Sequence, residues 1–185
     1  MVRFALPFLF AATAFAAAPA DHTITIFERR TIAIAVPEGW TFEEHRNDLG
    51  VQTVSLVDPS GEIHVDASFL PDEDNRLASR EALEDEMRLA FADLLKGAVE
   101  KDFRFVYAKT VDGLEGHMVF TDKTLVAKKI VPKDDRRLAT SGIRRWPGVF
   151  MLFTVLSNQT DSAAYKAAMR VITRDIRDTS EDSRA

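Results

Sequence analysis

The sequence predicts an α+β fold, in which an antiparallel β-sheet is flanked by a long central helix and a C-terminal helix. Apolar residues recur at every second position in segments before residue 72 and after residue 102, which is the period of a strand with one buried face. Between residues 77 and 99 the apolar period becomes helical, and it does so again after residue 160. Because the strands are grouped on either side of one helix, we expect an antiparallel sheet.

The first strands are expected within residues 24–36 and 63–69. Apolar side chains occupy alternate positions in the first stretch, at Ile24, Ile26, Ile32, Ile34 and Val36. The turn signal Asp58-Pro59-Ser60-Gly61 predicts a hairpin that leads into residues 63–69. One face of that second strand is apolar and the other is polar, so the strand is expected to be half exposed.

A long central helix is expected over residues 77–99. Its apolar residues share one stripe at helical spacing, namely Leu83, Met87, Phe91, Leu94, Leu95 and Ala98. Ser79 is the expected N-cap, because its hydroxyl can accept a hydrogen bond from an amide of the first turn. Acidic residues precede Lys96 and Lys101, which is the order that complements the helix dipole.

The second half of the chain is predicted to return to strands. Residues 103–110, 114–121 and 124–131 have β-type composition with turn signals between them, and they predict an antiparallel meander. Residues 132–147 are polar and basic without apolar periodicity, so a long loop is expected there. Residues 149–156 are apolar at nearly every position, as in a central strand that is covered on both faces.

The chain is predicted to end with a helix and a tail. Thr160 or Asp161 can cap this helix, whose apolar stripe is expected to rest on the sheet and comprises Tyr165, Ala168, Met169, Ile172 and Ile176. Residues 178–185 are polar and are expected to form a disordered tail.

Residues 1–20 have the pattern of a secretory signal peptide. Arg3 precedes an apolar run at residues 4–15, and Ala18 and Ala20 supply the small residues expected before a cleavage site. The apolar run is shorter than the roughly 20 residues that span a bilayer, so we expect no stable membrane insertion after signal cleavage. Residues 21–177 then form a single domain, and the expected location is periplasmic or secreted.

Composition narrows the functional classes. The chain has no cysteine, which excludes disulfides, thiolate catalysis and the lipid-bearing cysteine of a lipoprotein. The formal charge of −5 argues against nucleic acid as a partner. That charge is uneven, because residues 122–145 contain eight basic and three acidic residues.

Several local features resemble the PsbP-like superfamily, which includes exported proteins of the PsbP and DcrB types. An apolar strand runs into Pro37-Glu38-Gly39-Trp40, a hairpin surrounds residues 58–61, and a strand ending at Ser157-Asn158 precedes the last helix. The resemblance covers residues 23–177. It implies an α/β/α sandwich and a non-catalytic binding or assembly role, without a shared catalytic motif to transfer.

A basic segment is the main functional lead. Its side chains surround the expected loop and are Lys128, Lys129, Lys133, Arg136, Arg137, Arg144 and Arg145. If they converge, they can bind a phosphate, a carboxylate or an acidic partner. The alternative is a solvated loop in which Asp134 and Asp135 pair with the neighbouring arginines.

A metal site is a second hypothesis. Glu62, His64 and Asp66 lie at alternate positions on one predicted strand, and His117 or His45 can add a nitrogen from another strand. This mixture of ligands suits Zn²⁺ or Mn²⁺ and would support a metal-dependent hydrolase using His64, Asp66 and His117. A solvated sheet face accounts for the same pattern.

These observations favour an exported, soluble, non-catalytic binding or accessory protein without a cofactor. Its partner is expected to be an envelope protein or an anionic ligand, contacted through the basic region. A third possibility is a protein that binds a small apolar ligand between sheet and helix.

Overall fold

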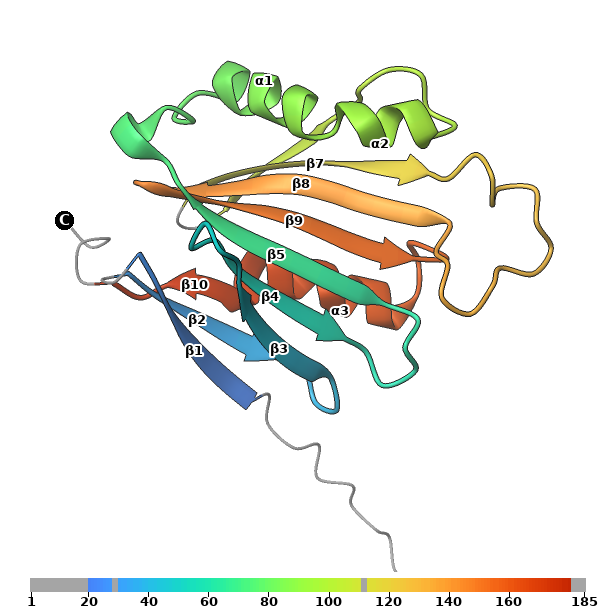
Figure 1. Cartoon of the computed structure of the whole chain (residues 1–185), viewed down its shortest axis with the longest axis horizontal. Helices are drawn as coiled ribbons and strands as arrows, with labels where there is room; N and C mark the ends of the chain where they lie inside the picture. The colour runs from blue at the N-terminus through green and yellow to red at the C-terminus, as the bar shows by residue number, and fades with distance from the viewer. Residues whose placement is uncertain (1–19, 28–29, 111–112, 181–185) are drawn as a thin grey trace, which may run out of the picture.

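The computed structural model describes residues 20–27, 30–110 and 113–180, and within them the fold is mostly β-structure (Figure 1). Two antiparallel sheets are present in the described chain, one of seven strands and one of three. In spatial order, the large sheet comprises β3 (Thr41–Arg46), β4 (Gln52–Val57), β5 (His64–Pro71), β9 (Val149–Ser157), β8 (Leu138–Trp146), β7 (Gly113–Thr121) and β6 (Val106–Thr110). The small sheet comprises β1 (Ala20–Ile26), β2 (Arg30–Val36) and β10 (Ile176–Asp178).

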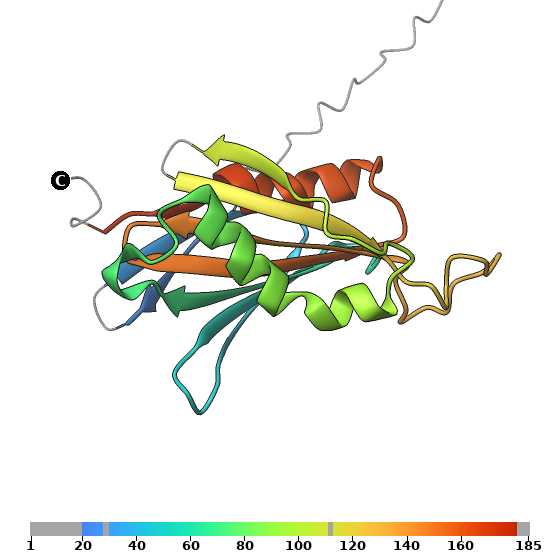
Figure 2. The same cartoon turned by 90° about the horizontal axis from the view of Figure 1, so that it is seen from above.

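The helices cover both faces of the large sheet. On one face, α1 (Arg80–Ala90) follows the 3-10 turn η1 (Glu73–Asn75) and continues into α2 (Ala92–Gly97). On the other face, α3 (Ala163–Arg170) and the π-helical turn η2 (Val171–Asp175) lie beside the small sheet (Figures 1 and 2). The large sheet is therefore the middle layer.

The predicted α/β/α sandwich with a long central helix is wrong. The three α-helices of the described chain have 11, 6 and 8 residues, and the expected central helix is interrupted at Phe91. Phe91 has φ −107° and ψ 10°, outside the helical region, and its side chain is buried. The second face also differs, because the alternating isoleucines of residues 24–36 form a separate sheet instead of joining the large one.

Two predictions for the basic part of the chain are also wrong. The loop predicted over residues 132–147 is wrong in part, because residues 138–146 form β8, which is paired on both sides. The strand predicted over residues 124–131 does not form, because these residues belong to a loop. Polar residues of β8 obscure its alternation, yet several are buried and bonded. Thr140 Oγ1 lies 2.8 Å from the Tyr165 hydroxyl, and Ser141 Oγ lies 2.9 Å from Thr154 Oγ1.

Other expectations are confirmed. Residues 149–157 form the strand at the centre of the large sheet, and Ser79 caps α1 by accepting a bond from the amide of Ala82 at 3.1 Å. The last helix forms, but Ser162 is its cap in place of Thr160 or Asp161.

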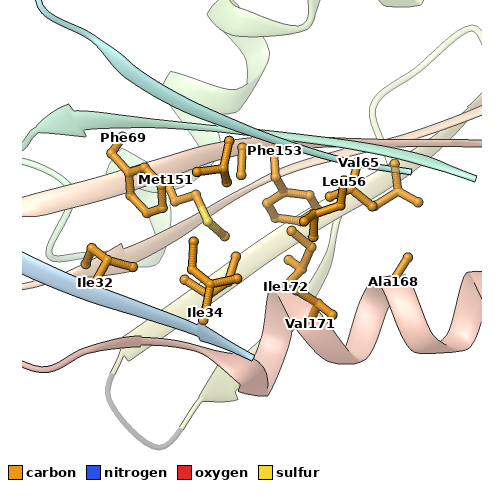
Figure 3. Close-up of a cluster of buried hydrophobic side chains, with 14 of the residues drawn as sticks. Ile32, Ile34, Leu56, Val65, Phe69, Met151, Phe153, Ala168, Val171 and Ile172 are labelled. Carbon is orange, nitrogen blue, oxygen red and sulfur yellow. The ribbon is translucent and has the colours of Figure 1, made fainter. Parts of the chain in front are cut away.

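Two hydrophobic cores lie on opposite faces of the large sheet. The α3 core fills the space between this sheet, α3 and the small sheet (Figure 3). Its side chains include Ile32, Ile34, Leu56, Val65, Phe69, Met151, Phe153, Ala168, Val171 and Ile172. The α1 core lies beneath α1 and comprises Leu77, Leu83, Met87, Phe91, Met118, Phe120, Ile143 and Phe150. Because β8 and β9 contribute to both cores, these two strands join them.

The chain ends bear on two further expectations. The tail was expected to begin at Asp178, but residues 178–180 are held against β2: Arg30 Nε donates to Asp178 Oδ2 at 2.7 Å, and the Thr179 amide donates to the Thr31 carbonyl at 2.9 Å. The rest of that tail, residues 181–185, lies outside the described residues, as does the predicted signal peptide apart from Ala20. Among the described helices, none has the length and apolarity to cross a membrane.

Candidate anion-binding loop

The loop of residues 122–137 joins β7 to β8 and projects beyond one end of the large sheet (Figures 1 and 2). It contains six basic and three acidic residues, which leaves a net charge of +3 in a chain whose formal charge is −5. The loop is therefore a local positive feature on an acidic protein.

Hydrogen bonds fix the base of this loop. The Asp122 amide donates to the Arg137 carbonyl at 2.8 Å, which closes the two ends of the loop. Thr124 donates to Asp122 Oδ1 from its hydroxyl at 2.7 Å and from its amide at 2.6 Å, and these bonds lower the pKa of Asp122. Leu125 is buried, so the first turn of the loop is also packed against the protein.

Two arginines hold the outer part of the loop through its carbonyl groups. Arg136 donates from Nη1 to the carbonyls of Lys133 and Asp135, each at 2.7 Å, from Nε to Glu62 at 2.8 Å and from Nη2 to Gly61. The Nη2 atom of Arg137 donates to the Lys128 carbonyl. The donors of Arg136 thus bind carbonyl groups of the loop itself and of the β4–β5 hairpin, and these bonds are not directed at a ligand.

The three lysines of the segment are the groups available to an anion. Lys128, Lys129 and Lys133 are exposed. Within the residues that the structure describes, none of their ammonium groups forms a salt bridge. The alternative in which Asp134 and Asp135 pair with neighbouring arginines is not observed, because Arg136 bonds to the main-chain oxygen of Asp135.

The other two predicted residues lie elsewhere. Arg144 and Arg145 are near the far end of β8, about 20 Å along the strand from Leu138 at roughly 3.3 Å per residue. Arg144 is buried, donates from Nη1 to the Ile172 carbonyl at 2.5 Å and lies over the Trp146 ring at 4.6 Å. Arg145 reaches Asp72 Oδ2 at 3.3 Å. The seven basic residues therefore do not converge.

A shallow groove of about 260 Å³ runs between α2 and the base of the loop. Its lining combines apolar side chains with Arg136 and Arg137 and includes Leu94, Phe120, Ala139 and Leu156. The Arg137 Nε atom is buried there without a hydrogen-bond partner. A second hollow of about 400 Å³ lies between the β4–β5 hairpin and residues 131–134.

The proposed metal ligands are not brought together. Strands β5 and β7 are separated by β9 and β8, so His64 and Asp66 lie about 14 Å or more from His117 at the usual strand spacing. They also occupy opposite faces, because His64 aligns with Leu156 of the groove, whereas His117 aligns with Gly142 beside Phe153 of the α3 core. His45 is exposed on β3. Among the described residues, no three His, Asp or Glu side chains form a group that could hold a metal ion.

A buried polar cluster beneath α3 was missed from the sequence. Glu115 is fully buried, and its Oε1 lies 2.6 Å from His117 Nδ1. Tyr165 lies nearby: burial and the negative charge of Glu115 raise its pKa, whereas the hydrogen bond with Thr140 opposes that shift. The alternation of Glu115 and His117 was the available signal, but it resembles that of any half-exposed strand.

No protein-family model matches the chain, and a search of curated proteins finds no match. The resemblance to the PsbP-like superfamily stays a prediction, and the function is inferred from the residues of this chain.

Proposed function

We propose that this chain is an exported, non-catalytic binding protein that contacts an acidic partner or an anionic ligand through residues 122–137. The observation that carries the proposal is the set of exposed ammonium groups of Lys128, Lys129 and Lys133 on a loop held in shape by arginine–carbonyl bonds. A fixed loop loses little conformational freedom on binding, so more of the charge attraction remains as affinity.

The different roles of arginine and lysine side chains within the loop support this proposal. Arginine suits several directed hydrogen bonds, and here Arg136 uses its fork to bind carbonyl oxygens. Lysine is a hydrated point charge on a flexible stem, which suits an anionic surface without a fixed geometry. Such an interaction is screened by salt, since exposed charges interact over a Debye length of about 8 Å at physiological ionic strength.

The test is a charge reversal with a matched control. The loop variant carries Lys128→Glu, Lys129→Glu and Lys133→Glu, whereas the control carries Lys101→Glu, Lys166→Glu and Arg174→Glu at exposed positions outside the loop. Both variants have the same net charge, and their affinities for heparin and for polyglutamate are measured at several salt concentrations. We expect the loop variant to bind about tenfold more weakly than the control, a difference that shrinks with salt. The proposal would be overturned if the loop variant and the control bound heparin equally well and also bound polyglutamate equally well.

A further inference from the structure

The anion-binding loop also exposes aliphatic side chains. Ile130 is 85% exposed and Val126 is 50% exposed, whereas Leu125 beside them is buried at 4%. Isoleucine and valine are among the residues most often found inside proteins. The loop therefore has an apolar anchor facing inward and two aliphatic side chains open to the surroundings.

The exposed position of Ile130 is fixed by the bonds on either side of it. Arg137 binds the carbonyl of Lys128, Arg136 binds the carbonyl of Lys133, and the Asp135 amide donates to Pro132 at 3.1 Å. Residues 129–132 thus form a tip between two anchored points. The loop that carries this tip projects beyond the sheet (Figure 1).

Three lysines lie close to this apolar tip in the sequence. Lys128 and Lys129 precede Ile130 directly, and Lys133 follows it by three residues. A bilayer offers matching chemistry, because aliphatic side chains can enter the boundary between headgroups and acyl chains while lysines remain beside the lipid phosphates. Anionic lipids attract basic segments within about a Debye length of the surface.

We propose that this loop docks on a membrane surface that contains anionic lipids, with Ile130 of the tip at headgroup depth, Val126 of the preceding turn as a second aliphatic contact and the three lysines against the phosphates. This inference rests on the proposed function and specifies the anionic partner. A stable protein interface buries roughly 800 Å² on each partner, which a narrow projecting tip does not supply, whereas a bilayer accepts a small convex insertion. The contact is reversible and peripheral.

The experiment uses protein recovered after export, with loss of the leader checked by intact mass, so that the apolar run of residues 4–15 does not bind lipid. Sedimentation with vesicles of phosphatidylcholine alone is compared with vesicles that also contain phosphatidylglycerol. The test variant is Val126→Ser with Ile130→Ser. The control is Leu49→Ser with Leu89→Ser, which removes two aliphatic side chains that are 88% and 77% exposed outside the loop.

We expect binding to the anionic vesicles, at least about tenfold weaker binding by the test variant and unchanged binding by the control. Equal loss in both variants, or no binding to anionic vesicles, would overturn the inference. If the vesicles are not bound but heparin affinity still depends on the loop lysines, the proposed function stands and its partner is a soluble anion. If neither probe depends on the loop, both proposals fail. Vesicle binding that needs the lysines but not Ile130 or Val126 would overturn the insertion step.

Discussion

At the scale of single residues, Asp58 shows how one carboxylate organises a turn. Its Oδ1 accepts the Ile63 amide at 2.7 Å, and its Oδ2 accepts the Ser60 hydroxyl at 2.5 Å. Burial alone would raise the pKa of Asp58, but these hydrogen bonds outweigh burial, and the pKa is lowered from its ordinary 3.8. The turn that positions the carbonyls for Arg136 therefore depends on an ionised aspartate.

We expect Asp58→Asn to reduce the free energy of unfolding at pH 7 by about 1 to 2 kcal/mol, because the amide cannot accept both bonds equally well. Since the folded pKa lies below the unfolded one, the stabilisation is present above about pH 4 and is lost as pH falls through the folded value. Urea unfolding at pH 7 and pH 3 measures the difference, which should shrink at pH 3. Asp48→Asn, on the exposed neighbouring turn, is the control. An undiminished difference at pH 3 would contradict this account.

At the scale of elements, β8 depends on a close approach of backbone and side chains at Gly142. A Cβ atom there would lie 2.3 Å from the Gly116 carbonyl oxygen, 2.6 Å from the Phe153 ring and 2.7 Å from the His117 Cβ. Real Cβ atoms essentially never approach other atoms this closely, so neighbouring strands would have to move. Gly142 is thus required by packing between strands.

We expect Gly142→Ala to lower the free energy of unfolding by about 1 to 3 kcal/mol or more, the usual range for overpacking. Gly97→Ala is the matched change, because its Cβ would meet nothing within 4 Å at the end of α2. That variant should be neutral or up to about 1 kcal/mol more stable. Chemical denaturation of both variants tests the pair, and equal stability of the two would refute the packing argument.

The same elements show what the sequence could predict. Where large apolar residues recur at every second position, as in β2, or where apolar and polar residues alternate, as in β5, the prediction of a strand with one buried face is confirmed. In β8 the buried face carries Thr140, Gly142 and Arg144, whose partners come from α3, β7 and η2, far away in the sequence. No local pattern contains those partners, so the sequence predicts a loop where the structure has a strand.

The candidate site was predicted in part for a related reason. Closeness in sequence predicts that Arg144 and Arg145 lie with the basic residues of the loop. The nine-residue strand β8 instead carries them to the other end of the sheet. The exposed Lys128, Lys129 and Lys133 follow from composition alone. The role of Arg136 and Arg137 as anchors could not be inferred, because it depends on carbonyl groups presented by the folded loop and the β4–β5 hairpin.

In the molecule as a whole, the seven-stranded sheet connects two hydrophobic cores that lie on its opposite faces. Trp146 belongs to the α3 core, and Trp40 packs against it. The chain has two tryptophans, so its tryptophan fluorescence reports on the α3 core alone. The α1 core contains the fully buried Leu83 and neither tryptophan, so it can be perturbed without changing a tryptophan directly.

This arrangement tests whether the molecule unfolds as one unit. We expect Leu83→Ala to destabilise the protein by about 2 to 5 kcal/mol, because Leu83 is fully buried and its removal leaves a cavity. Since β8 and β9 serve both cores, the loss should shift the tryptophan and far-ultraviolet circular dichroism transitions together, as in two-state unfolding. Leu89→Ala, an exposed position on the same helix, should leave both midpoints nearly unchanged. If Leu83→Ala shifted the circular dichroism transition but not the tryptophan transition, α1 and α2 would be an independently unfolding layer. The shared strands would then join the cores in space without coupling their stability.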